Sequence, residues 1–133
     1  MLSVRHVRLW RVLSCIVLAA MIFVCLLPAQ ELPETGISDK WEHSIAYVLL
    51  TLWFAGLYPR SRYWVVALGL FLMGVAIEFA QAGMHMGRQG DVHDVIANTT
   101  GIVAGVLLAL AGLGGWVQWI DGWTRGRDAV KSD

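Results

Sequence analysis

The chain has 133 residues, of which 57% are hydrophobic and 15% are charged, and its formal net charge is zero. That length suits one domain, and the zero net charge gives no electrostatic basis for binding nucleic acid. The apolar residues stand in long blocks, which is typical of an integral membrane protein and not of a soluble globule.

Four stretches are long and apolar enough to cross a bilayer as helices, which takes about 20 residues. They cover about residues 9–27, 43–58, 63–82 and 94–116, of which the second is short. The first could instead be a cleaved signal peptide because arginines precede it, but its length and the sequence LLPAQE after it favour an uncleaved helix. The sequence therefore predicts an all-α membrane protein, a single domain over residues 1–133 folded as a bundle of four transmembrane helices.

The placement of Lys and Arg predicts how these spans are oriented. Eight of the ten basic residues lie in the N-terminal region, the second connection or the C-terminal tail, whereas the first and third connections hold only Lys40 and Arg88. Basic residues near the ends of spans favour the cytoplasmic side. We therefore expect both termini to be cytoplasmic, and the connections that hold Lys40 and Arg88 to face outward.

Two periodic patterns accompany the fourth span. An apolar stripe follows it at helical spacing, formed by Trp116, Trp119, Ile120 and Trp123. This stripe predicts a short interfacial helix, although an aromatic girdle without regular structure would also fit; beyond it we expect a flexible tail over residues 124–133. A stripe of small residues lies within the span, at Ala97, Gly101, Gly105 and Ala109. Such a stripe lets a neighbouring helix approach closely, and we expect it to serve packing within the chain more than dimerisation.

Polar and ionisable residues gather where the spans reach the predicted outer face. They are Asp39, Lys40, His43 and Tyr47 on the second span, Glu78 and Gln81 on the third, Arg88 and Asp91 in the connection, and Asp94 and Asn98 on the fourth. Residues at spacings of three, four and seven share a helical face. Three polar faces at one depth avoid lipid only by turning inward, so we expect a shallow cleft that opens to the outside.

Individual members of this group also have purely structural explanations. Asp39 and Asp91 suit helix N-caps, and Asn98 suits an interhelical hydrogen bond. These roles do not account for a histidine and two further acids at the same depth. The remaining histidines of this region, His85 and His93, are expected to be surface loop residues.

The sequences DKWEHSIAY, EFAQ and GRQGDVHDVIANTTG together resemble the VanZ-like family of small bacterial membrane proteins. The resemblance covers about residues 39–105, and the shared positions of the family fall on the ten polar residues above and on Gly101. The family's namesake is linked to resistance to the antibiotic teicoplanin. The resemblance therefore implies a multi-pass protein of a bacterial cytoplasmic (inner) membrane with a role at the cell envelope.

The expected cleft fits two functions. The first is binding of a lipid headgroup, a lipid-linked cell-envelope precursor or an amphiphilic glycopeptide antibiotic, with Lys40 and Arg88 meeting phosphate or carboxylate. The ligand-binding residues would be Asp39, Lys40, Tyr47, Gln81, Arg88, Asp91 and Asn98. The second is an enzyme that acts on such an amphiphile, with His43, Glu78 and Asp94 as its acid–base residues.

Other functions have weaker support in the sequence. A transporter or channel is less favoured, because the inner halves of the spans carry no polar residues that would continue a path. A metal site built from His43, Glu78, Asp91 and Asp94 is conceivable, but no HExxH or comparable ligand spacing appears. We therefore predict no metal and no other cofactor. The lipid bilayer is the one partner that the composition requires.

Overall fold

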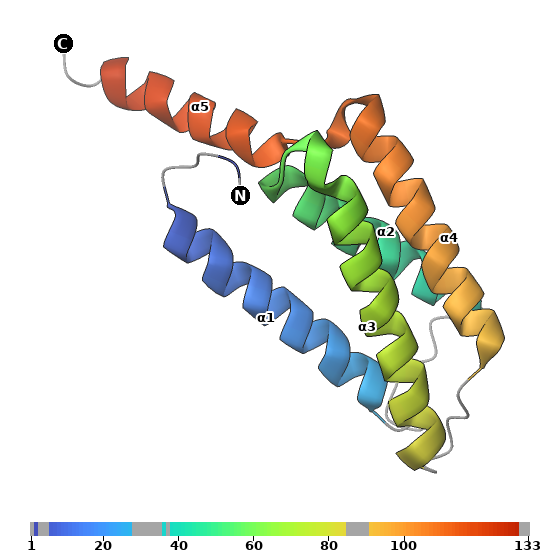
Figure 1. Cartoon of the computed structure of the whole chain (residues 1–133). Helices are drawn as coiled ribbons and strands as arrows, with labels where there is room; N and C mark the ends of the chain where they lie inside the picture. Colours follow the sequence, from blue (N-terminus) through green and yellow to red (C-terminus); the bar gives the residue numbers. More distant parts are fainter. Residues whose placement is uncertain (1, 3–5, 28–35, 37, 85–90, 131–133) are drawn as a thin grey trace.

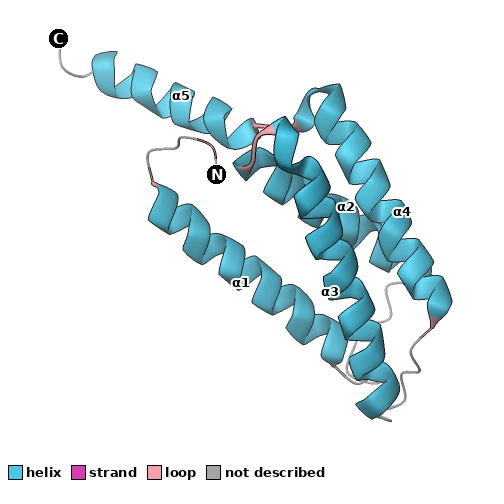
Figure 2. Cartoon of the chain, in the orientation of Figure 1, coloured by secondary structure: helices cyan, strands magenta, loops and turns pink. Residues whose placement is uncertain are grey.

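The computed structural model describes residues 2, 6–27, 36, 38–84 and 91–130, with backbone only for 84 and 124–130. Its elements are α1 (Val7–Leu26), α2 (Asp39–Leu57), the 3₁₀ turn η2 (Arg60–Arg62), α3 (Tyr63–Met84), α4 (Val92–Leu108), the π-helical segment η3 (Ala109–Leu113) and α5 (Trp116–Val130). No strand occurs among these residues (Figure 2). The prediction of an all-α chain is therefore confirmed.

Three helical stretches are long and apolar enough to cross a membrane. They are Val7–Leu26, Arg60–Gly83 and Val92–Trp123. Helix α2 is not among them, because its first turn carries Asp39 and Glu42 as well as Lys40. The structure thus supports a membrane protein with three such stretches, and a fourth crossing by α2 remains a prediction.

The outer surface of the helices is apolar. Large side chains point away from the interior on every long helix, with Phe23 65% exposed on α1, Leu49 62% on α2, Phe79 76% on α3 and Leu107 61% on α4. A soluble protein rarely leaves so many large apolar groups in water. Lipid is the surrounding that accommodates them, since every helix satisfies its own backbone hydrogen bonds.

Helices α2 and α4 form the centre of the bundle and pack against each other more extensively than any other pair. Two glycines of α4 allow this approach. A Cβ at Gly101 would overlap the Ser44 carbonyl oxygen of α2, and a Cβ at Gly105 would lie 2.6 Å from the Thr51 Cβ. All four members of the small-residue stripe are buried. The stripe therefore packs α4 against α2 within the chain, as predicted.

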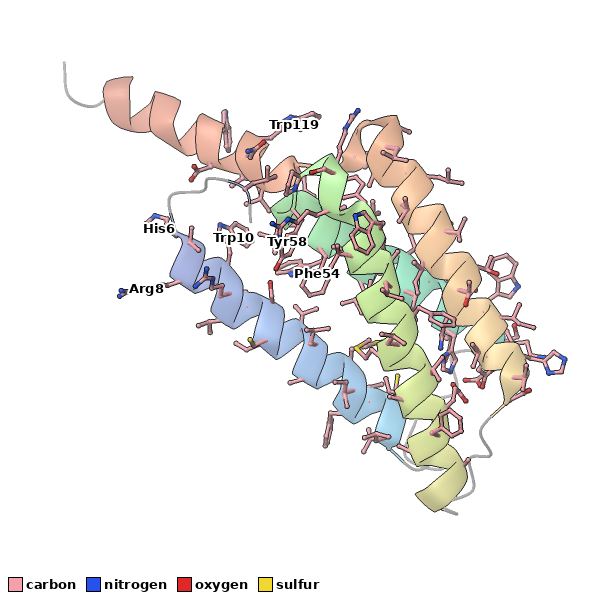
Figure 3. The ribbon with its side chains drawn as sticks, viewed as in Figure 1. His6, Arg8, Trp10, Phe54, Tyr58 and Trp119 are labelled. Atoms are coloured by element: carbon pink, nitrogen blue, oxygen red, sulfur yellow. The ribbon has the colours of Figure 1, made fainter. Side chains whose placement is uncertain are left out.

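Both ends of the described chain lie at the same end of the bundle as η2, which we call the termini end (Figure 1). The Leu2 backbone N–H donates to the Leu57 carbonyl at the end of α2, at 2.8 Å. Three indole rings gather nearby, with centroids 5.6–6.0 Å apart: Trp10 of α1, Trp53 of α2 and Trp116 of α5. The side chain of Arg8 points away from the bundle there (Figure 3). This arrangement agrees with termini on one side of a membrane, but the compartment they face remains a prediction.

The predicted fourth span, 94–116, is interrupted. Helix α4 ends at Leu108, η3 contains Gly112 with a φ of 127°, and Gly115 has a φ of 71° before α5 begins. Glycine adopts such left-handed backbone without strain, so these positions end the helix where the apolar pattern alone would continue it. Helix α5 then leaves the bundle and stays helical to Val130, past residue 124, where a flexible tail was expected (Figure 1).

Candidate functional site

The polar residues singled out in the sequence lie at the other end of the bundle, where α1 and α3 end and α2 and α4 begin. We call it the polar end. Six of their side chains are buried, each at most 8% exposed: His43, Tyr47, Glu78, Gln81, Asp94 and Asn98. Asp39 and Lys40 are exposed in the first turn of α2, and Asp91 is half-buried. Arg88 lies outside the described residues.

His43 joins α2 to α4. Its Nδ1 lies 3.0 Å from the Asn98 Oδ1, and both side chains are buried. The amide oxygen can only accept, so Nδ1 carries the hydrogen and donates it. The opposite ring nitrogen, Nε2, then faces the Asp39 carboxylate one turn earlier on α2, at 3.8 Å. Asn98 thus fixes the ring orientation and leaves Nε2 available toward the first turn of α2.

Asp94 brings a second acid to this histidine. It lies in the first turn of α4, where the helix dipole favours negative charge. One ligating atom from each of Asp39, His43 and Asp94 falls within a group whose members are at most 4.8 Å apart. The arrangement places two carboxylates and one imidazole close together between α2 and α4. These helices are distant in sequence, since His43 and Asn98, which join them, are 55 residues apart.

Asp91 connects α3 to α4 and caps α4. Its backbone N–H donates to the Glu78 Oε2 at 3.1 Å. Its carboxylate accepts from the His93 backbone N–H at 2.9 Å and lies 2.7 Å from the His93 Nδ1. The backbone and then the ring hydrogen bond of His93 lower the pKa of the Asp91 carboxyl. The N-cap role considered from the sequence is confirmed; His93 is an exposed partner of that cap and lies on α4, not in a loop.

Gln81 and Tyr47 differ in how their buried polar atoms are satisfied. The Gln81 Nε2 donates to the Cys25 carbonyl at the end of α1, at 2.6 Å. The Tyr47 hydroxyl has no hydrogen-bond partner among the described residues. A Cβ at Gly74 of α3 would lie 2.9 Å from that hydroxyl and 3.2 Å from the Asn98 Nδ2. Gly74 therefore gives both groups room beside α3.

Several residues of this end had no signal as site residues in the sequence. Ser44 donates to the Ala97 carbonyl at 2.9 Å and so ties α2 to α4 one residue after His43. The Cys25 carbonyl and Gly74 belong to apolar runs, where nothing in the pattern marks them. A sequence pattern reveals polar side chains. It does not reveal the backbone carbonyls that accept their hydrogen bonds or the space that a glycine leaves for them.

Two apolar cavities lie away from this cluster. The larger, about 470 Å³, opens between α1, α2 and α3 and is lined mainly by apolar side chains, with Tyr58 and Arg62 at the termini end. Figure 3 labels Phe54 and Tyr58 of this lining, and Tyr58 packs with Trp10 around the buried Leu57 and Val117. The smaller, about 320 Å³, lies between α1 and α2. None of the predicted site residues lines either cavity.

A helical chain with apolar outer faces, three stretches able to cross a bilayer and a buried polar cluster at one end belongs among the small integral membrane proteins. The sequence model of the VanZ/LLP1 family matches residues 16–114, and the chain is therefore a member of that family. The matched range takes in α2, α3 and α4 entirely and ends before α5. No curated protein and no solved structure matches the chain.

Proposed function

We propose that this protein lies in a bacterial cytoplasmic membrane and binds the polar head of an anionic amphiphile at its polar end. The observation that carries this proposal is the burial of six polar side chains from α2, α3 and α4 at one end of an otherwise apolar chain. Ionisable groups at membrane depth are costly and are kept mainly where they serve a function. Membership of the VanZ/LLP1 family agrees with a role at the cell envelope.

The chemistry of these groups favours a particular class of ligand. Lys40 and Arg88 are the basic residues of the two predicted outer connections, and they suit a phosphate or carboxylate. The amide of Asn98 and the hydroxyl of Tyr47 suit hydroxyl or amine groups. A phospholipid, a lipid-linked envelope precursor and a lipoglycopeptide antibiotic all combine such a head with an apolar anchor. The distribution of basic residues along the chain favours an outward-facing polar end.

Native mass spectrometry of the purified protein tests the proposal. The wild-type protein, released from nanodiscs that hold phosphatidylglycerol and phosphatidylcholine, should retain the anionic lipid in preference. Separate samples with a polyprenyl-linked precursor or with teicoplanin distinguish the three sources of the headgroup. The double variant Lys40→Gln/Arg88→Gln should lose the preference in whichever sample shows it. The matched control is Arg60→Gln/Arg62→Gln at the termini end, and equal losses in both double variants would refute the polar end as the binding site.

An enzyme acting on the same amphiphile is the second candidate, and the geometry of His43 favours it. Asn98 holds the ring so that Nε2 faces Asp39, with Asp94 close by. A histidine oriented in this way beside carboxylates suits general acid–base catalysis. Incubation with each amphiphile should then change its mass, and His43→Gln should bind without changing it. Recovery of every amphiphile unaltered from the wild-type protein would refute the enzyme, and binding would remain the proposed function.

A further inference from the structure

Three metal-ligating side chains converge at the polar end. Asp39 and His43 are one turn apart on α2, and Asp94 comes from the first turn of α4. Their ligating atoms lie within 4.8 Å of one another. His43 is 6% exposed and Asp94 8% exposed, whereas Asp39 is at the surface. This is a mixed set of two oxygen donors and one nitrogen donor, supplied by the helix pair that packs most tightly.

The surroundings of His43 match those of a metal ligand. A histidine that binds a metal ion through one ring nitrogen commonly donates the other N–H to a carbonyl or carboxylate oxygen. Here Nδ1 donates to the Asn98 Oδ1, so Nε2 is the nitrogen that faces the carboxylates. Asn98 is itself buried at 3% exposure, so its orientation is fixed by packing.

Electrostatics also favours a cation at this point. Two carboxylates only a few ångströms apart repel each other when both are ionised, and burial of Asp94 weakens the screening of that repulsion by water. A divalent ion between them would convert the repulsion into attraction. Lys40, the neighbouring base on α2, is exposed, so water weakens the compensation that its positive charge gives to the two carboxylates.

The sequence pattern predicts no metal site, but on this geometry we propose that Asp39, His43 and Asp94 bind one divalent transition metal ion, such as Zn²⁺ or Mn²⁺. Imidazole suits Zn²⁺, and carboxylates suit both Zn²⁺ and Mn²⁺. With metal–ligand bonds of about 2.0–2.2 Å, tetrahedral ligands lie about 3.4 Å apart. The His43 Nε2 and Asp39 Oδ1 are 3.8 Å apart, so a small rotation of the exposed Asp39 side chain brings them to that separation.

Three protein ligands leave at least one coordination position open. Because Asp39 is the exposed member of the set, the open side faces the membrane surface and not the helix interface. The ion would bind a phosphate or carboxylate oxygen there. In the proposed function, it would supply a positive charge that holds the anionic head of the amphiphile. Only this role in ligand binding rests on the proposed function; binding of the ion does not.

The first experiment measures the metal alone. The full chain is purified in detergent with an affinity tag free of histidine, loaded with Zn²⁺ or Mn²⁺, desalted and measured by inductively coupled plasma mass spectrometry. We expect about one ion per chain in the wild-type protein, and about a tenfold or greater loss in Asp94→Asn and His43→Gln. Asp39→Asn changes an exposed side chain, so it tests the site without disturbing the interior.

The matched control is His93→Gln, which removes the other histidine that contacts an aspartate at this end, the exposed pair with Asp91. It should retain the ion as the wild-type protein does. A wild-type protein with less than about a tenth of an ion per chain would overturn the metal site, and so would equal loading of Asp39→Asn and wild type.

A second measurement separates this inference from the proposed function. Anionic lipid retention is compared before and after removal of the metal by a chelator. Loss of retention on chelation supports an ion that holds the headgroup. Retention that survives chelation overturns that role while the proposed binding function stands, whereas a bound ion without any anionic lipid preference overturns the proposed function and leaves the metal site intact.

Discussion

Replacement of Gly101 by alanine tests the packing that brings the polar residues together. An alanine Cβ would overlap the Ser44 carbonyl oxygen and lie 3.0 Å from the Tyr47 Cβ. A backbone oxygen cannot turn aside as a side chain can, so α2 and α4 must separate. Overpacking of this kind costs about 1–3 kcal/mol. Alanine regains about 1 kcal/mol through its higher helix propensity, so we expect a net loss of up to about 2 kcal/mol in the free energy of unfolding.

Unfolding of the purified protein in detergent, followed by tryptophan fluorescence, measures this loss. The control is Gly69→Ala on α3, where an added Cβ meets nothing within 4 Å. There we expect stability to stay the same or to rise by up to about 1 kcal/mol, because only the gain in helix propensity remains. Equal stability of the two variants would refute the close approach of α4 to α2 at Gly101.

Three further predictions concern the cap, the buried hydroxyl and the orientation. The lowered pKa of Asp91 means that its bonds from His93 stabilise the fold at neutral pH and cease to do so as the pH falls through that pKa; the difference in unfolding temperature between wild type and Asp91→Asn should therefore shrink in acid. Tyr47→Phe should unfold at the wild-type temperature or above, because the buried hydroxyl has no hydrogen-bond partner among the described residues, yet retain less amphiphile. In cells, an impermeant thiol reagent should label Ser38→Cys at the polar end but not Ser61→Cys at the termini end. The opposite result would show that the termini end faces outward.

The positions of the helices were largely predictable, because long apolar runs are a strong signal of membrane-spanning helices and charged residues lie in the segments between these runs. The starts of helices were less so. Helix α2 begins at Asp39 and not at residue 43, since its first turn is charged and falls outside any apolar window. The break after Leu108 was missed for the opposite reason: Gly112 and Gly115 interrupt the helix through their backbone angles, while the hydropathy of the segment does not change.

The gathering of polar residues could be anticipated from helical spacing, but their partners could not. The spacing put His43 and Asn98 at the same depth, and the structure joins them across 55 residues. Gln81 was grouped with the cluster, yet its amide bonds to the Cys25 carbonyl of an apolar helix. A backbone carbonyl has no signature in a sequence. The Gln81 amide therefore ties α3 to α1, whereas Asn98 contacts the ionisable ring of His43 within the polar cluster.

One face of α4 encodes both the packing of the bundle and its polar cluster. Asp94, Asn98 and Gly101 follow one another at spacings of four and three, so they share a face, and all three are buried against the neighbouring helices. Gly101 admits the backbone of α2 at Ser44, the residue next to His43. The close approach thus fixes the distance at which His43 meets Asn98 and Asp94. A substitution that widens this contact should loosen the bundle and the cluster together, so Gly101→Ala should weaken binding of Zn²⁺ as well as the fold, whereas Gly69→Ala should affect neither adversely.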